Sequence, residues 1–148
     1  MTMPSVFISS SPEETVAIGE HIGEILKPGG VLALRGPLGA GKTCLVKGVA
    51  RFLAVEEEIT SPTYTIVSEY EGKLEGKTLP FYHIDAYRLQ GEDEFYALGG
   101  EEYLFGRGLS VVEWSERIPN SLPKEAWIVN IEIAADARRI IRLSGGTQ

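Results

Sequence analysis

The sequence predicts an α/β fold in which helices flank a mixed, mostly parallel central sheet with an antiparallel hairpin at its edge. A continuous apolar run at residues 31–34 and a largely apolar segment at residues 109–112 are typical of strands that are covered on both faces. Amphipathic helical segments alternate with strands along the first part of the chain, which is the order expected of a parallel sheet. The length of 148 residues is close to that of one typical domain, so we expect a single domain over residues 1–148.

Two helices are expected in the first half of the chain, after a short strand at residues 6–8. Ser11 can cap the first helix, Pro12 suits its first position, and Glu14 completes a capping box. Apolar residues at helical spacing form one face of this helix: Ile18, Ile22, Ile25 and Leu26. The second helix follows a glycine-rich loop and has apolar positions of its own: Leu45, Val46, Val49, Ala50 and Leu53.

Strands dominate the second half of the chain. Two pairs of segments predict antiparallel hairpins: residues 65–70 with 78–84 across a turn at 72–76, and residues 126–133 with 138–143 at a sheet edge. Two short helices, at residues 92–98 and 101–105, are expected to break at Gly99 and Gly100. These elements complete the predicted sheet and its helical layers.

The charge balance and the cysteine content exclude several classes of protein. The chain has 14 Lys and Arg against 21 Asp and Glu, a net charge of −7, which argues against binding nucleic acid or anionic membrane mainly through electrostatics. Its single cysteine, Cys44, excludes a disulfide framework and a cysteine-rich zinc site. No signal peptide is visible, and no run approaches the ~18 apolar residues of a membrane span. We therefore expect a cytoplasmic chain without membrane contact.

Residues 36–43 have the sequence GPLGAGKT, which matches the phosphate-binding pattern G-x-x-x-x-G-K-[ST]. Glycines let backbone N–H groups turn toward phosphate oxygens, and the helix that follows directs the positive end of its dipole at the same anion. Lys42 would reach the β- and γ-phosphates, and the Thr43 hydroxyl would bind Mg²⁺. We therefore expect a P-loop NTPase-like domain with these nucleotide-binding residues: Leu38, Gly39, Ala40, Gly41, Lys42 and Thr43.

The motifs of other nucleotide-binding proteins fit less well. A dinucleotide-binding loop would need a glycine where Cys44 stands. The chain contains neither an Asn-Lys-x-Asp motif, which would recognise guanine, nor an Asp-x-x-Gly switch. Adenine nucleotides are therefore the better prediction.

Acidic residues follow two strands that should end near the phosphate-binding loop. Asp85 ends the apolar segment around Ile84, and Glu113 ends the run at residues 109–112. One of the two would hold Mg²⁺ through water, while the other would orient the attacking water or sense the γ-phosphate; spacing alone does not assign the roles. His83 lies within the first of these strands and is expected to serve packing rather than catalysis.

The chain resembles the bacterial TsaE (YjeE) family of P-loop ATPases, which take part in the synthesis of threonylcarbamoyladenosine in tRNA. Four blocks carry the resemblance, in order: LGAGKT at 38–43, SPTYT at 61–65, DAYRL at 85–89 and VEW at 112–114. The likeness spans roughly residues 11–133. It implies a compact domain with a mixed sheet and helices on both sides, and hydrolysis of ATP as the activity.

The resemblance also implies roles for particular residues. The Mg²⁺ ligands would be Thr43 and Glu113, and the catalytic residues would be Lys42 and Asp85, with Asp85 as the essential aspartate. A switch-like loop responding to nucleotide would include Thr60, Ser61 and Thr63. The implied partners are TsaB and TsaD, and TsaD transfers the threonylcarbamoyl group, so tRNA would be met only indirectly, through the complex.

Two other functions remain open at this point. A small-molecule kinase would use the same phosphate loop but needs a lid and an acceptor pocket, for which residues 92–105 are the only candidate segment. A nucleotide-dependent binding switch would bind a partner under the control of ATP and ADP without turnover.

Overall fold

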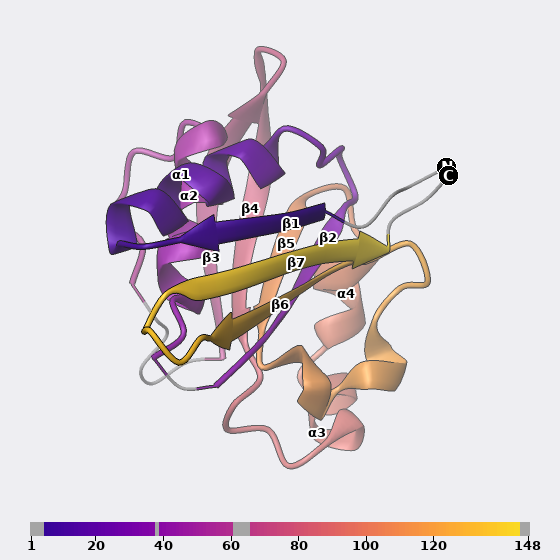
Figure 1. Ribbon diagram of the computed structural model, residues 1–148. Helices are drawn as coiled ribbons and strands as arrows, with labels where there is room; N and C mark the ends of the chain where they lie inside the picture. Colours follow the sequence, from indigo (N-terminus) through magenta and orange to yellow (C-terminus); the bar gives the residue numbers. More distant parts are fainter. Residues whose placement is uncertain (1–4, 38, 61–65, 146–148) are drawn as a thin grey trace.

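The computed structural model describes residues 5–37, 39–60 and 66–145, and in these segments it shows a seven-stranded sheet of order β1-β7-β6-β2-β5-β4-β3 (Figure 1). The strands are β1 (Ser5–Ser9), β2 (Val31–Arg35), β3 (Val67–Leu74), β4 (Lys77–Asp85), β5 (Leu109–Glu113), β6 (Trp127–Ile133) and β7 (Arg139–Gly145). The helices are α1 (Pro12–Gly23), α2 (Lys42–Phe52), α3 (Glu92–Ala97) and α4 (Gly100–Leu104), with two 3-10 turns, η1 (Ser115–Arg117) and η2 (Pro119–Ser121).

The sheet is mixed and mostly parallel, as predicted. Parallel pairings join β6 to β2, β2 to β5 and β5 to β4. Antiparallel pairings add β7 to β6, β1 to β7 and β3 to β4. Strand β1 therefore runs in the same direction as the four parallel strands, and only β7 and β3 of the strands described run against them.

The sheet separates two apolar clusters. Helices α1 and α2 lie side by side over one face, and their apolar residues pack with alternate residues of the strands, such as Leu34 and Val111 (Figure 1). The other face packs against α3, α4 and the 3-10 turns, where Phe95 and Leu104 meet Val112. Neighbouring residues of β5 thus point into different clusters, which explains why this strand is apolar along most of its length.

Ser11 caps α1 as predicted, whereas the Glu14 carboxylate bonds one residue earlier than the expected capping box and the helix ends sooner. The Ser11 side chain accepts a hydrogen bond from the Glu14 N–H (3.1 Å), and the Glu14 carboxylate accepts one from the Ser10 N–H (2.7 Å). The helix ends at Gly23, because the next N–H groups bond to carbonyls three residues back and tighten the chain. Leu26 still lies in the core, so the apolar spacing identified a buried residue that is not helical.

The β3–β4 hairpin has a tighter turn than predicted. The connection is only Glu75 and Gly76, with φ angles of 52° and 78°, which is typical of a two-residue hairpin turn. Gly72 lies within β3 instead of the turn. A Cβ atom there would lie 3.2 Å from Cβ of Leu53, so glycine lets the strand pass close beneath the end of α2. Residue 65, where the strand was predicted to begin, lies outside the described residues.

Strands β6 and β7 form the predicted C-terminal hairpin, but β7 lies one strand in from the sheet edge. Strand β1 pairs with β7 over five residue pairs and takes the outer position. The antiparallel hairpin at an edge of the sheet is formed by β3 and β4. None of the helices in the described part of the chain has the length and apolarity that crossing a membrane requires.

Helices α1 and α2 pack closely because each presents a glycine to the other. A Cβ atom at Gly48 would lie 2.0 Å from the carbonyl oxygen of Val16 and 2.7 Å from the amide nitrogen of Glu20. A Cβ atom at Gly19 would lie 2.3 Å from the carbonyl oxygen of Leu45. Backbone atoms rather than flexible side chains occupy these positions, so larger residues require the helices to separate.

Replacing Gly48 by alanine is therefore expected to lower the free energy of unfolding by about 1–3 kcal/mol, although alanine has a helix propensity about 1 kcal/mol better than that of glycine. Lys47→Ala is the matched control, because Lys47 is exposed on the same helix; it should change stability by less than about 0.5 kcal/mol. Urea unfolding followed by circular dichroism measures both variants. A Gly48→Ala protein as stable as the parent would contradict this account of the packing.

Candidate functional site

The residues singled out in the sequence meet at the carboxyl ends of the parallel strands. Asp85 ends β4 and Glu113 ends β5, and the two are paired in register; Leu34 of β2 pairs with Glu113 on its other side, just before the glycine-rich loop. A cleft of about 380 Å³ opens here. The residues that line it are Gly39, Ala40, Gly41, Lys42, Thr43, Cys44, Asp85, Tyr87, Glu113 and Trp114.

The loop between β2 and α2 has the backbone conformation that its glycines permit. Gly39 and Gly41 have φ angles of 77° and 107°, in the region that glycine adopts with little strain. Helix α2 begins directly after Gly41, which has no side chain to cap the helix. The start of α2 therefore has no side-chain cap from the residue before it, and its first residues line the cleft, which is an arrangement that favours an anion.

Lys42 is buried at the floor of the cleft, with 5% of the residue exposed. Its Nζ atom donates to the carbonyl oxygens of Gly36 (2.5 Å) and Pro37 (3.1 Å) and lies 3.7 Å from the centre of the Trp114 ring. Burial lowers the pKa of the Lys42 ammonium, while the carboxylates of Glu113, Glu116 and Asp85 oppose that shift. The lysine is thus held in place by the loop and by an aromatic face.

Trp114 adopts a backbone conformation that is uncommon for a large residue. Its φ angle is 59°, in the left-handed region, at the turn that follows β5. Its ring also packs against Tyr87, with ring centroids 4.9 Å apart. The turn therefore places an aromatic pair along the wall of the cleft, next to Lys42.

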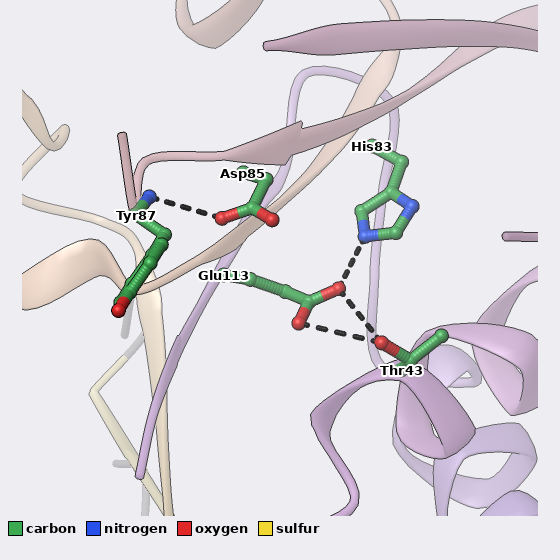
Figure 2. A network of polar contacts seen from close by, with 5 residues as sticks. All are labelled: Thr43, His83, Asp85, Tyr87 and Glu113. Atoms are coloured by element: carbon green, nitrogen blue, oxygen red, sulfur yellow. Dashed lines mark hydrogen bonds and ion pairs between the residues drawn. The ribbon is translucent and has the colours of Figure 1, made fainter. Parts of the chain in front are cut away.

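Glu113 forms the centre of a buried polar network (Figure 2). Glu113 is only 4% exposed, and its Oε2 atom lies 2.5 Å from Nε2 of His83. The Thr43 hydroxyl donates toward the two carboxylate oxygens at 3.5 and 3.3 Å. The network joins β4, β5 and the first turn of α2.

Asp85 lies beside this network and is only partly buried. Its Oδ1 atom accepts a hydrogen bond from the Tyr87 N–H (2.9 Å) (Figure 2). Burial raises the pKa of the Asp85 carboxyl, and the charge of Glu113 adds to the effect; the Tyr87 N–H, His83 and Lys42 act in the opposite direction. The two acidic residues therefore lie in different environments, one inside a network and one at its border.

His83 serves more than the packing expected of it. The residue is fully buried, as packing requires, but its ring contacts Glu113. A signal was present in the sequence, because residues two apart in a strand point to the same face, and His83 stands two before Asp85. What the sequence did not show is that β5 lies beside β4 in the register that brings in Glu113.

Arg139 was also missed as a contributor to the site. Its Nε and Nη2 atoms donate to the carbonyl oxygens of Ala40 (3.1 Å) and Gly39 (3.2 Å), so β7 supports the loop from behind. A second pocket of about 310 Å³ opens on this side of the loop. It is lined by Ser9, Ser10, Ser11, Pro12, Thr15, Gly39, Ala40, Gly41, Cys44, Ala137 and Arg139. No local pattern marks Arg139, because its partners are about a hundred residues away in the chain.

Some predicted residues are not placed by the structure. Leu38, Ser61 and Thr63 lie outside the described residues. Thr60 is exposed at the end of the described segment that precedes them.

The donors present fit a magnesium ion that is held jointly by protein and phosphate. Mg²⁺ prefers oxygen ligands and commonly takes one or two carboxylates, with waters and substrate phosphates as the rest. Thr43 and Glu113 offer a hydroxyl and a carboxylate close together at the cleft. Over residues 5–37, 39–60 and 66–145 the structure shows no cluster of three or more His, Cys, Asp or Glu side chains that would make an all-protein metal cage.

The amino-acid sequence matches one protein family model and several proteins of known name. The family model described as "Threonylcarbamoyl adenosine biosynthesis protein TsaE" matches residues 9–141. The chain is 39% identical over 137 residues to the tRNA threonylcarbamoyladenosine biosynthesis protein TsaE of Treponema pallidum, covering 93% of this chain and 98% of that protein. It is 44% identical over 131 residues to the Bacillus subtilis protein of that name, covering 88% and 79%.

A solved structure agrees with this result. The crystal structure of Bacillus subtilis YdiB superimposes with a TM-score of 0.76 at 38% sequence identity, covering 99% of this chain and 88% of that one. The fold predicted from the sequence is therefore shared by an experimentally determined relative. The chain belongs to the TsaE family.

Proposed function

We propose that this chain is a Mg²⁺-dependent ATPase that supports N6-threonylcarbamoyladenosine modification of tRNA together with the TsaB and TsaD proteins. The observation that carries the chemistry is the convergence of Lys42, Thr43, Asp85 and Glu113 on one cleft at the end of the parallel strands. The relatives, which are named for tRNA threonylcarbamoyladenosine biosynthesis, support the pathway.

The loop and Lys42 would bind the phosphates. Backbone N–H groups at the start of α2 would surround the β-phosphate, and Lys42 would exchange the carbonyl oxygens of Gly36 and Pro37 for phosphate oxygens. Thr43 and Glu113 would hold Mg²⁺, which when bound neutralises charge on the phosphate oxygens. These groups stabilise the charge that the transferred phosphoryl group spreads over its oxygens.

Asp85 would orient the attacking water and accept its proton. Its carboxylate borders the cleft and is held by the Tyr87 N–H, so it has a fixed direction. A raised pKa makes a carboxylate a stronger base, which suits this role. Glu113 is less suited to it, because His83 and Thr43 already contact its oxygens.

The second pocket is the place we propose for the adenosine part of the nucleotide. It shares the loop residues Gly39 and Gly41 with the main cleft, so a single nucleotide can extend from one to the other. Its other walls come from the end of β1, the start of α1, Cys44 of α2, and the hairpin residues Ala137 and Arg139.

Water is a better acceptor than a second organic substrate for this cleft. A kinase would need a lid and an acceptor pocket from residues 92–105, but none of the cleft's lining residues comes from that segment. Phe95 and Leu104 instead anchor α3 and α4 in the apolar cluster on the other face of the sheet. A net charge of −7 suits a chain that meets tRNA through its partners in the cytoplasm.

Hydrolysis of Mg²⁺-ATP by the purified chain tests the function directly. We expect slow phosphate release by the chain alone and faster release when a purified TsaB–TsaD complex is added. Activity that is indifferent to these partners would separate the chemistry from tRNA modification. Partner binding controlled by ATP and ADP without any turnover would instead identify a binding switch.

Replacing Asp85 by asparagine should lower the hydrolysis rate about 10²–10⁴-fold, the usual contribution of a general base. Nucleotide affinity should remain close to that of the parent, because asparagine preserves the shape and can still accept from the Tyr87 N–H. Single-turnover phosphate release and equilibrium nucleotide binding measure the two effects. The matched control is Asp93→Asn, an exposed position on α3 outside the cleft. A fully active Asp85 variant would refute the assignment.

The same substitution should alter how stability depends on pH. Because the pKa of Asp85 is raised in the folded protein, its ionisation favours the unfolded chain. Asp85→Asn should therefore be more stable than the parent at neutral pH, and this advantage should shrink as the pH falls and the parent carboxyl becomes protonated. Urea midpoints of both proteins between about pH 7 and about pH 4 provide the measurement. An advantage that grows in acid would contradict the raised pKa.

A further inference from the structure

His83 lies in the interior of β4 and is fully buried, yet the proposed chemistry gives it no task. Its Nε2 atom lies 2.5 Å from Oε2 of Glu113. Across residues 5–37, 39–60 and 66–145 no hydrogen-bond partner is found for its Nδ1 atom. Within the described residues, the His83 ring therefore makes its polar contact with Glu113, the carboxylate that we assign to the metal.

Packing alone does not explain a histidine at this position. Phe81 lies on the same face of β4, and Val111 is paired with His83 on β5; both are fully buried in the apolar cluster. A polar ring in such surroundings costs free energy unless it gains a hydrogen bond, whereas a phenyl ring would not incur that cost. The contact with Glu113 is the feature that distinguishes histidine from phenylalanine here.

The chemistry of the two groups determines the direction of the hydrogen bond. An ionised carboxylate only accepts, so Nε2 carries the hydrogen and donates it to Oε2 of Glu113. This tautomer leaves a lone pair, and no N–H group, at Nδ1. In Figure 2 the carboxylate of Glu113 lies between the His83 ring and the Thr43 hydroxyl.

We propose that His83 is a positioning residue, which orients the Glu113 carboxylate toward Thr43 and so strengthens Mg²⁺-dependent nucleotide binding. This inference rests on the proposed function, which assigns Thr43 and Glu113 to the metal. The Thr43 hydroxyl reaches both carboxylate oxygens, at 3.5 and 3.3 Å, while His83 contacts Oε2. A carboxylate held in this way has a single orientation when the metal and phosphate arrive.

The test compares nucleotide affinity with and without Mg²⁺ in the full chain, using a fluorescent ADP analogue. His83→Phe keeps a ring but removes the donor, and should lower the Mg²⁺-dependent gain in affinity about 10–100-fold. Affinity measured in EDTA should stay as in the parent. His83→Gln retains an N–H group near the position of Nε2 and should restore most of the gain.

Phe81→Leu is the matched control, because it disturbs packing two residues away on the same face of β4. It should lower stability and leave the Mg²⁺-dependent gain unchanged. An undiminished gain in His83→Phe, or an equal loss in Phe81→Leu, would overturn the inference while leaving the metal assignment intact. A parent whose nucleotide affinity does not respond to Mg²⁺ would overturn both.

A second measurement observes the His83 ring directly by NMR. It requires no metal, and His83 itself is not replaced. The chain has two histidines, so the imidazole ¹⁵N spectrum contains two rings, and His21→Gln identifies the signal of His83. We expect the tautomer with hydrogen on Nε2 and a change of that signal in Glu113→Gln. A ring that carries its hydrogen on Nδ1 alone could not donate to Glu113 and would overturn the inference.

Discussion

Glu113 carries a carboxylate at the end of β5 in a residue that is 4% exposed, and a charge so far removed from water is stable only when donors surround it. His83 and Thr43 supply those donors from two other elements. The requirement therefore links β4, β5 and α2: a shift in the pairing of β4 with β5 would remove the imidazole, and a shift of α2 would remove the hydroxyl. The positions of β4, β5 and the start of α2 around the cleft therefore depend on the donors that this carboxylate requires.

The apolar part of the structure makes this arrangement possible. Gly48 and Gly19 let α1 and α2 approach each other at backbone distance. The two helices can therefore cover the same face of the sheet side by side, with α2 starting at the loop. Behind the loop, Arg139 bonds to the carbonyl oxygens of Gly39 and Ala40. The glycine-rich loop is therefore supported from the helix that follows it and from a strand near the end of the chain.

The two carboxylates at the edge of the sheet differ although they are paired in register. Glu113 is enclosed by its donors, whereas Asp85 borders the cleft, accepts from the Tyr87 N–H and has a raised pKa. Such a difference in environment is the usual way in which a protein gives two like groups different tasks. Lys42 is held between a loop carbonyl oxygen and the Trp114 ring. The negative charges of both carboxylates act on its ammonium group.

The sequence by itself determined the kind and order of the strands and helices and the candidate loop, though not the end of α1 or the β3–β4 turn, because periodicity, capping at Ser11 and the spacing of residues 36–43 are local properties of the chain. It also indicated that Asp85 and Glu113 each end a strand near this loop, but not that the two strands are neighbours in the sheet. Tertiary structure alone decided that His83 meets Glu113, that Arg139 supports the loop and that β1 covers β7. Those contacts join residues 30 or more positions apart, and strand order and register, which no local pattern encodes, bring them together.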